Sequence, residues 1–406
     1  MTHINHKDIR ELGDEFGTPL YVYDKQKITE NYNRLNNAFV KHYPKTKIHF
    51  SVKSNSNVHI LNIFQQLGSG ADCSSPNEVM LAQKAGFADQ DIIYTGNYES
   101  RDDFVNLKNH SVQINLDDST SFDRVIEHFI PKIVSFRINP GIGKGGHEGI
   151  TTGGTDAKFG IPYEYAAEAY KKAKQQGVSK FGIHMMTGSN NLEPYHFAQT
   201  VEKLMLISKN IFDQIGAKPD FVDIGGGFGI PYEDDELPLD IEKTAELVTE
   251  IFTEKCQKYG FGEPYLYLEP GRYLIADAGW LITQVTGTKH SYKNFVGVDA
   301  GMSTLLRPAL YGAFHRTYLY GKEGEDTVVN LCGQICENSD VFAKSVHLPV
   351  AEIGDLMIIR DVGAYGYVMS SNYNNRLRPA EVLIDNSKPK LIRRRETFDD
   401  LISLIP

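Results

Sequence analysis

Short apolar segments alternate with longer segments of helical periodicity through the first two thirds of the chain. The short segments are rich in β-branched and aromatic residues, which favours strands, and the segments between them repeat their apolar residues with the spacing of helices. Eight strands are expected, at Ile48–Val52, Gly70–Cys73, Asp91–Tyr94, Val112–Asn115, Ile133–Ile138, Lys180–Met185, Phe221–Ile224 and Tyr265–Leu268. Eight strands separated by helices predict a parallel (β/α)8 barrel.

The pattern changes after Arg272, where apolar segments follow one another with little helix between them. Strands are expected there at Leu281–Val285, Asn294–Val298, Asp326–Cys332, Asp355–Ile359 and Ala380–Ile384. Such a succession predicts a mainly antiparallel β domain. Near the start of the chain, a helix is expected over residues 7–16 and a strand over Thr18–Asp24. Because no barrel helix precedes this strand, we expect it to join the second domain, which gives a barrel at 26–275 and a discontinuous β domain at 1–25 plus 276–406.

Composition excludes several classes of protein. The net charge is −10 and the acidic residues are not gathered in a tail, which argues against a nucleic-acid partner or an anionic membrane surface. The apolar segments fall far short of the ~20 residues of a membrane span, and the N-terminus lacks the apolar core of a signal peptide. The four cysteines form no C-x-x-C pair, which argues against a disulfide framework or a metal site. We therefore expect a cytoplasmic protein without a metal.

Lys53 follows the first barrel strand, at the edge where barrel enzymes place their chemistry. Burial there would cost its ammonium group hydration, lower its pKa and yield an amine suited to a Schiff base. The alternative from this stretch alone is a solvated lysine at a strand exit. Polar residues also follow the later strands, with His184 after the sixth and the run Gly225-Gly226-Gly227 after the seventh.

Glu269-Pro270-Gly271-Arg272 follows the eighth strand. Consecutive glycines expose backbone N–H groups that suit a phosphate, and an arginine can bind further phosphate oxygens. A lysine, a carboxylate and a phosphate site on one rim are what pyridoxal phosphate requires, because the carboxylate keeps the pyridine nitrogen protonated. The alternatives are a glycine turn present for packing and a structural ion pair between Glu269 and Arg272.

The sequence resembles the fold-type III, alanine racemase-like pyridoxal-phosphate decarboxylases, and among them the diaminopimelate decarboxylases, over nearly its whole length. The resemblance rests on many short motifs in the same order, which makes it specific. The matching stretches are Phe16–Asp24, Val52–Asn57, Gly70–Ser75, Arg137–Gly141, Thr152–Ile161, Gly225–Gly227, Glu269–Arg272, Val298–Met302, Arg307–Gly312, Cys336–Asp340, Gly363–Gly366 and Ser370–Asn374.

The resemblance implies a role for particular residues. Lys53 resembles the Schiff-base lysine, and Glu269 the partner of the pyridine nitrogen. Cys336 resembles the proton donor to the reacting carbon, and Tyr373 resembles a residue that adds a hydroxyl. The remaining cofactor-binding residues are Asp72, Ser189, Gly227, Gly271, Arg272 and Tyr365, and the substrate-binding residues are Arg272, Arg307, Tyr311, Glu337 and Tyr365. Cys336 and Glu337 resemble residues donated by a neighbouring subunit, which implies a homodimer.

One motif departs from the family pattern. Where the family has a histidine that stacks on the cofactor ring, this chain has Met186. A thioether can also pack against a ring face, so we expect the cofactor to bind. His184, two residues earlier, is expected to be a packing residue of the barrel interior. Because of this departure, the resemblance does not determine which amino acid is the substrate.

The leading hypothesis is decarboxylation of meso-diaminopimelate to L-lysine, in lysine biosynthesis. The alternatives are N-citryl-ornithine, in siderophore biosynthesis, or D-ornithine or D-lysine. A non-enzymatic relative would have lost the lysine, the thiol or the β domain, whereas this chain keeps Lys53 and Cys336.

Overall fold

The computed structural model describes residues 3–141, 154 and 156–406. The chain forms two compact units, and each is described by itself. The barrel unit consists of Asn31–Pro231 and Leu237–Tyr273, and the β unit consists of Met1–Glu30, Tyr232–Glu236 and Leu274–Pro406. The β unit is therefore discontinuous, and it includes a short segment near residue 234 that sequence reasoning assigned to the barrel. Among the residues of the matching motifs, Thr152, Gly153 and Thr155 lie outside the described residues.

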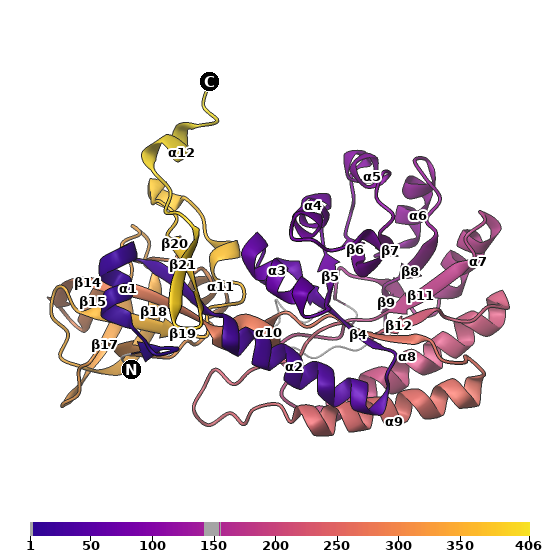
Figure 1. Ribbon diagram of the computed structural model, residues 1–406, viewed down its shortest axis with the longest axis horizontal. Coiled ribbons are helices and arrows are strands. Elements are labelled where there is room, and N and C mark those ends of the chain that lie inside the picture. The colour runs from indigo at the N-terminus through magenta and orange to yellow at the C-terminus, as the bar shows by residue number, and fades with distance from the viewer. Residues whose placement is uncertain (1–2, 142–153, 155) are drawn as a thin grey trace. The chain divides into compact units, whose positions relative to one another are not determined.

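The barrel unit is a closed ring of eight parallel strands, so the predicted fold class is confirmed (Figure 1). The ring runs in the order β11-β12-β13-β4-β5-β6-β7-β8. Its strands are β4 (Thr46–Ser51), β5 (Gly70–Cys73), β6 (Ile92–Gly96), β7 (Gln113–Leu116), β8 (Ile133–Phe136), β11 (Lys180–His184), β12 (Phe221–Asp223) and β13 (Tyr265–Leu268). A short parallel pair, β9 (Ile138–Asn139) with β10 (Ile161–Pro162), follows β8. Because all eight barrel strands are parallel, the residues that follow them gather at one rim.

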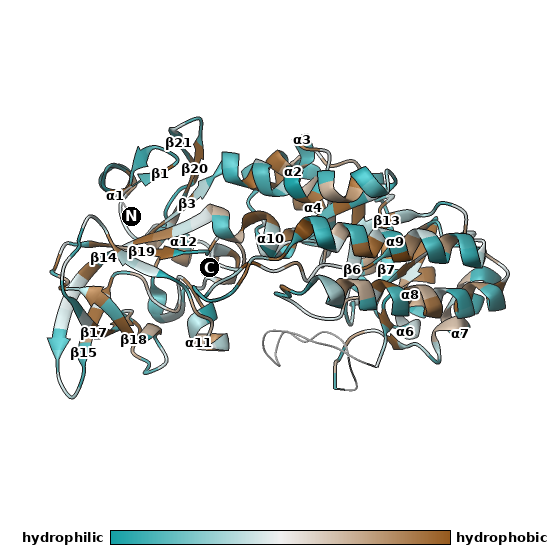
Figure 2. Ribbon diagram, turned by 90° about the horizontal axis from the view of Figure 1, so that it is seen from below, coloured by the Kyte–Doolittle hydropathy of each residue, from teal (hydrophilic) through white to brown (hydrophobic). Residues whose placement is uncertain are grey.

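Amphipathic helices connect the barrel strands. They are α2 (Lys25–His42), α3 (Val58–Gln66), α4 (Pro76–Lys84), α5 (Arg101–Leu107), α6 (Ser119–Ile126), α7 (Ala166–Gln175), α8 (Pro194–Ile215) and α9 (Ile241–Tyr259). In α9 the buried residues Ala245, Val248 and Phe252 recur at helical spacing, and Asp240 caps its N-terminus. Figure 2 shows the resulting mixture of hydrophilic and hydrophobic residues along α8 and α9. No helix among the described residues is long and apolar enough to span a membrane.

Large rings fill the barrel interior where neighbouring residues are glycine. Phe221 and Tyr267 stack with their ring centroids 4.6 Å apart, and His49 packs edge-on against Tyr267 at 4.4 Å. A Cβ atom at Gly182 would lie 2.1 Å from the Phe221 ring, and one at Gly70 would lie 2.2 Å from the ring of His49. The two glycines therefore make room for the rings that close the barrel core.

A single 3₁₀ turn and a short extended segment connect β4 to the next helix. Strand β4 ends at Ser51, and a single 3₁₀ turn, Val52–Ser54, carries Lys53. Helix α3 begins only at Val58, where the side chain of Asn57 caps it by accepting a hydrogen bond from the backbone N–H of His59 at 3.0 Å. The helix cap therefore lies at the last residue of the polar run 54–57.

The β unit is built on a sheet of nine strands. Seven of them lie in the order β18-β17-β15-β14-β3-β20-β21, and β19 and β16 extend the sheet from β14. Their bounds are β3 (Leu20–Asp24), β14 (Gly279–His290), β15 (Asn294–Val298), β16 (Thr317–Leu319), β17 (Asp326–Cys332), β18 (Val341–Pro349), β19 (Leu356–Arg360), β20 (Ala380–Asp385) and β21 (Lys388–Arg393). The pairs β15–β17 and β3–β20 are parallel and the others are antiparallel, as expected for a mainly antiparallel domain.

The N-terminal strand β3 lies inside this sheet, as its sequence context predicted. It pairs with β14 on one side and with β20 on the other. Leu20 and Val22 pack in one core cluster with Ile282 and Val382, so segments from both ends of the chain share this core. The smaller elements of the unit are β1 (His3–Ile4), β2 (Lys7–Asp8), α1 (Ile9–Phe16), α11 (Arg307–Tyr311) and α12 (Phe398–Ile402), and α10 (Arg272–Ile275) crosses from the barrel unit.

Candidate active site

Lys53 and Asp72 form an ion pair on the rim of the barrel. Lys53 comes from the turn after β4, and Asp72 from the neighbouring strand β5. The hydroxyl of Ser51 donates to the same Oδ2 atom of Asp72 at 2.9 Å, and Asp72 is fully buried. Burial, followed by the charge of Glu269, raises the pKa of Asp72, and the ammonium of Lys53 opposes this. The pair therefore holds the Lys53 amine at a fixed place on the rim.

Lys53 itself is not buried. Its side chain is 44% exposed, because it projects from the 3₁₀ turn and not from the strand interior. The expectation that burial activates this lysine is wrong for the structure as it stands. Its polar partner, the buried carboxylate of Asp72, distinguishes it from a solvated lysine at a strand exit.

Glu269 follows β13 and is buried on the same rim. The Nε2 atom of His184, at the end of β11, lies 3.1 Å from Oε2 of Glu269. Burial alone would raise the pKa of Glu269, but the charge and hydrogen bond of His184, with smaller effects of Lys53 and Asp223, lower it to about 2. The Oε1 atom of Glu269 is buried and has no hydrogen-bond partner among the described residues. Glu269 is therefore an ionised carboxylate whose Oε1 atom can accept a further hydrogen bond.

This arrangement corrects the expectation for His184. It was expected to be a packing residue, but it is the hydrogen-bond partner of Glu269. His184 and Glu269 belong to two different strands, so their spacing in the sequence does not indicate that they are in contact. The signal available was indirect, since both residues end strands that converge at the same rim.

Glycines after β12 and β13 bring backbone close to backbone around this carboxylate. A Cβ atom at Gly226 would lie 2.4 Å from the carbonyl oxygen of Glu269, and one at Gly227 would lie 2.8 Å from that of Gly188. Gly227 also has a φ of +93°, a conformation that favours glycine. A Cβ atom at Gly271 would lie 2.9 Å from the side chain of Ser54. The loops that follow these two strands therefore pack tightly against their neighbours.

Arg272 and Ser189 lie beside these glycines. The side chain of Arg272 is buried, and its Nη2 donates to Ser189 Oγ at 3.4 Å. A buried guanidinium, a hydroxyl and glycine backbone are groups that bind phosphate oxygens. Met186, at the predicted ring-stacking position, lies on the same loop as Ser189. Its sulfur accepts a hydrogen bond from the backbone N–H of Gly226 at 3.2 Å.

The remaining predicted site residues belong to the β unit. Arg307 and Tyr311 stand at the two ends of α11, one helical turn apart. Arg307 is buried, with Nη1 2.8 Å from His315 Nε2 and its guanidinium over the ring of Tyr232 at 4.8 Å. The arginine is thus held in one orientation by a ring and an imidazole that sequence reasoning did not identify.

Cys336 and Glu337 lie together on an exposed turn of the β unit. Asn374 Nδ2 donates to Cys336 Sγ at 3.0 Å, and the hydroxyl of Tyr373 donates to Glu337 Oε1. The hydrogen bond to Glu337 raises the pKa of Tyr373. Tyr365 has a φ of +58°, which is unusual for a residue with a side chain. The structure therefore brings the two motifs Cys336–Asp340 and Ser370–Asn374 together, as one cluster of polar side chains.

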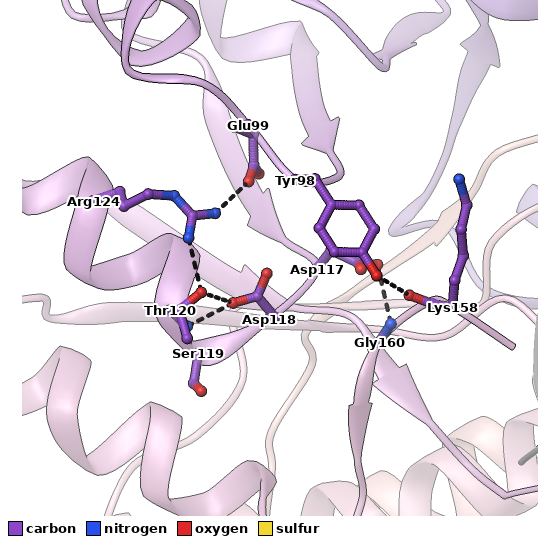
Figure 3. Close-up of a pocket in the computed structure, with 9 residues that line it drawn as sticks. All are labelled: Tyr98, Glu99, Asp117, Asp118, Ser119, Thr120, Arg124, Lys158 and Gly160. Atoms are coloured by element: carbon purple, nitrogen blue, oxygen red, sulfur yellow. Dashed lines mark hydrogen bonds and ion pairs between the residues drawn. The ribbon is translucent and has the colours of Figure 1, made fainter.

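A polar cavity of about 590 Å³ lies at the barrel rim after β6 and β7 (Figure 3). Arg124 and Glu99 form an ion pair in its wall at 3.2 Å, and Asp117 accepts from the backbone N–H of Gly160 at 3.0 Å. The hydroxyl of Tyr98 donates to the carbonyl of Lys158 at 3.4 Å. Sequence reasoning did not identify this cavity, whose lining residues bond partly to one another.

The barrel site fits pyridoxal phosphate. Lys53 presents an amine, the unpartnered Oε1 of Glu269 can accept a bond from a protonated ring nitrogen, and the glycine loops with Arg272 can bind a phosphate. Barrel and site together have the features of a fold-type III pyridoxal-phosphate enzyme.

Comparisons with known proteins agree with this class. Residues 26–276 match the family model described as pyridoxal-dependent decarboxylase, pyridoxal binding domain. The diaminopimelate decarboxylase of Methanothermobacter thermautotrophicus is 42% identical to the chain over 98% of the chain and 94% of that protein.

Two solved structures are also similar. The diaminopimelate decarboxylase of M. jannaschii in complex with L-lysine superposes with a TM-score of 0.92 at 33% identity, covering 100% of this chain and 96% of the other. The Helicobacter pylori diaminopimelate decarboxylase complexed with L-lysine gives 0.90 at 33% identity, covering 98% and 99%.

The chain belongs to the diaminopimelate decarboxylase family of pyridoxal-dependent decarboxylases. It is a decarboxylase, and its cofactor is pyridoxal 5′-phosphate.

Proposed function

We propose that the protein decarboxylates meso-diaminopimelate to L-lysine and CO2. The observation that carries the proposal is the barrel site, in which a lysine, an ionised buried carboxylate and a glycine-rich loop meet at one rim. The substrate is inferred from the full-length similarity to diaminopimelate decarboxylases and from the L-lysine found in two of their structures. The product would place the enzyme in lysine biosynthesis.

The cofactor would be held by residues of the barrel unit. Lys53 would hold it covalently through Nζ, Gly227, Gly271, Arg272 and Ser189 would bind its phosphate, and Glu269 would accept a hydrogen bond from its ring nitrogen. When bound, pyridoxal phosphate supplies an electron sink for the electron pair that the departing CO2 leaves behind. Glu269 serves this chemistry because an ionised carboxylate stabilises a protonated ring nitrogen, whereas a neutral or cationic group would not.

Asp72 would set the proton state of Lys53. Its buried carboxylate contacts the ammonium and is itself oriented by Ser51. A carboxylate at this distance favours the charged form of the amine, so the ion pair can hold the proton that Lys53 releases or takes up during catalysis. Met186 would pack against the cofactor ring, with its sulfur oriented by Gly226 N–H.

The substrate would be recognised by residues of the β unit. Arg307 has a fixed orientation between His315 and Tyr232, which suits a bidentate bond to the distal carboxylate, and Tyr311 and Tyr365 would add further contacts. Cys336 would donate the proton that replaces CO2, and Glu337 would bind the distal ammonium group. Both lie on an exposed turn, so we propose that they serve the active site of a second subunit in a homodimer.

The same proposal includes a cytoplasmic location. All four cysteines are present as thiols, which fits a reducing compartment.

The proposal is tested by measuring CO2 release from a small panel of amino acids. We expect turnover of meso-diaminopimelate with L-lysine as the product. The panel also contains N-citryl-ornithine, D-ornithine and D-lysine, because Met186 replaces the usual histidine beside the reacting group. Release of CO2 from one of these compounds without release from diaminopimelate would overturn the assigned substrate and leave the decarboxylase class intact.

A further inference from the structure

Asp223 is a buried acid at the active-site rim that the proposed chemistry does not use. It ends strand β12, and its side chain is almost completely buried. One of its oxygens, Oδ1, accepts a hydrogen bond from the backbone N–H of Gly225 at 2.8 Å. Gly225 is the first glycine of the loop that follows, and it has a φ of +70°. Asp223 therefore anchors the start of the glycine loop.

The side chain of Asp223 also lies against the carboxylate that faces the cofactor. A carboxylate oxygen of Asp223, a carboxylate oxygen of Glu269 and a ring nitrogen of His184 all lie within 4.8 Å of one another. All three residues are buried, at 1%, 6% and 2% exposure for Asp223, Glu269 and His184. Two buried carboxyl groups this close repel each other when both are ionised, because the repulsion is poorly screened in the interior. This repulsion favours a proton on one of them.

The surroundings decide which acid holds it. Glu269 has the imidazole of His184 at 3.1 Å and the ammonium of Lys53 among its neighbours, and both favour its charged form. Asp223 has a neutral backbone N–H on one side and the charges of Glu269 and Asp72 on the other. Burial, followed by the charge of Glu269, accordingly raises the pKa of Asp223 well above its usual value. The buried guanidinium of Arg137 also interacts electrostatically with Glu269.

We propose that Asp223 is a positioning residue, which stays protonated at neutral pH and donates a hydrogen bond to Glu269, so that Glu269 remains ionised and correctly oriented. A carboxylate offers about four lone-pair sites, so Glu269 can accept from His184, Asp223 and the cofactor ring at once. The inference rests on the proposed function only in that Glu269 faces the ring nitrogen. Asp223 thereby connects the glycine loop, which would bind the cofactor's phosphate, to Glu269, which would face the cofactor's ring nitrogen.

The test uses the full-length holoenzyme with two substitutions at this position. Asp223→Asn keeps an oxygen for Gly225 N–H and an N–H₂ donor for Glu269, so it copies the protonated acid. Asp223→Leu has a similar size and removes both hydrogen bonds. The matched control is Asp220→Asn, since Asp220 also accepts a backbone N–H, that of Phe181 at 2.9 Å, but lies just before β12, whereas Asp223 is the last residue of β12.

We expect Asp223→Asn to bind the cofactor with nearly unchanged affinity, whereas Asp223→Leu weakens cofactor binding roughly 10- to 100-fold, the effect of losing a hydrogen bond to a charged group. The infrared spectrum of the wild type should contain the C=O stretch of a protonated carboxyl group, which Asp223→Asn removes and Asp220→Asn keeps. The spectrum does not depend on which amino acid is decarboxylated, so a wrong substrate assignment would leave this result unchanged.

Two outcomes would overturn the inference. One is a cofactor affinity of Asp223→Asn as low as that of Asp223→Leu, because Asp223 would then act as a charged group. The other is identical carboxyl bands in the wild type and Asp223→Asn. The infrared comparison remains decisive even if Asp223→Leu does not fold.

Discussion

At the scale of single residues, the chemistry of Lys53 has to be explained by its partner and not by its burial. With 44% of its side chain exposed, the lysine keeps much of its hydration, and the buried carboxylate of Asp72 is the group that orients it. This is the reverse of a lysine activated in an apolar pocket. The amine is held in place as a cation, and the surrounding acids form a buried network around it.

Replacing Lys53 by alanine tests its role directly. We expect Lys53→Ala to lose the visible absorbance of bound cofactor and to lower kcat by roughly 10²–10⁴-fold, since both the attachment point and a proton carrier are removed. Spectra and turnover of the purified variant measure the two effects. Lys47→Ala is the matched control, because Lys47 lies on the same strand and pairs with Asp91. Unchanged absorbance in Lys53→Ala would refute covalent attachment at this residue.

His49 gives a prediction about acid stability. The ring is fully buried, and neither ring nitrogen has a hydrogen-bond partner among the described residues. Burial, helped by the charge of Lys47, lowers its pKa from about 6.5 to about 3. Between pH 6.5 and pH 3 the unfolded chain binds a proton at this residue, whereas the folded protein does not. Protonation therefore favours the unfolded chain, so the contribution of neutral His49 to the free energy of unfolding is complete above pH 6.5 and is lost as the pH falls toward 3.

The substitution His49→Phe should therefore reduce the acid sensitivity of the fold. The wild type is expected to lose about 2 kcal/mol more of its free energy of unfolding between pH 8 and pH 5 than the variant does. Denaturant titrations at the two pH values measure this difference. His347→Gln, on the exposed side of β18, serves as a control with no effect on the slope. Equal losses in His49→Phe and the wild type would contradict the prediction.

At the scale of elements, the close approach of the loops after β12 and β13 depends on the absence of side chains. Gly226→Ala would place a Cβ atom 2.4 Å from the carbonyl oxygen of Glu269, so one of the two loops must move. We expect a loss of about 1–3 kcal/mol of stability and weaker cofactor binding. Thermal unfolding and cofactor titration measure both. Gly287→Ala is the control, since nothing lies within 4 Å of its added Cβ; similar losses in both variants would refute the steric explanation.

The strand pattern predicted the barrel well, because a parallel strand buried on both faces is a short apolar run between helices. It failed for three strands of the nine-stranded sheet of the β unit and for the two-residue strands β1 and β2. Half of the residues of β21, Lys388–Arg393, are charged and most are exposed, and β18 has a mixed burial pattern. Strands β18 and β21 are the two edge strands of the sheet, so each has one backbone edge with no partner strand in the sheet. For this reason their sequences show little alternation of apolar and polar residues. The third, β16, has only three residues.

The site could be predicted as a set of residue types but not as a network. Strand ends located Lys53, the glycine run and Glu269, because a parallel barrel gathers these positions at one rim. The partners His184 and Asp223 were not assigned, since hydrogen bonds across strands depend on side-chain orientation. The same limit applies to His315 and Tyr232 around Arg307.

At the scale of the whole molecule, the proposed homodimer gives a test by subunit mixing. Lys53→Ala and Cys336→Ala each should inactivate the pure enzyme. If Cys336 serves the other subunit's barrel, a mixed dimer has one intact site, and equal mixing after subunit exchange should recover about a quarter of the wild-type activity. Activity assays before and after mixing measure the recovery. Should Cys336 serve its own subunit, no combination would produce an intact site and the mixture would stay inactive.

The place of β3 between β14 and β20 has a consequence for the order in which the protein folds during synthesis. The barrel segment leaves the ribosome as one stretch and can close while translation continues. Strand β3 is the first strand of this sheet to be made, yet Ala380, the first residue of its partner β20, follows Asp24 by 356 positions. At about 5–20 residues per second, the strand waits roughly 20–70 s for its second neighbour. The first strand of this sheet to be made is thus among the last to be enclosed on both edges, and its apolar side chains stay partly uncovered during that interval.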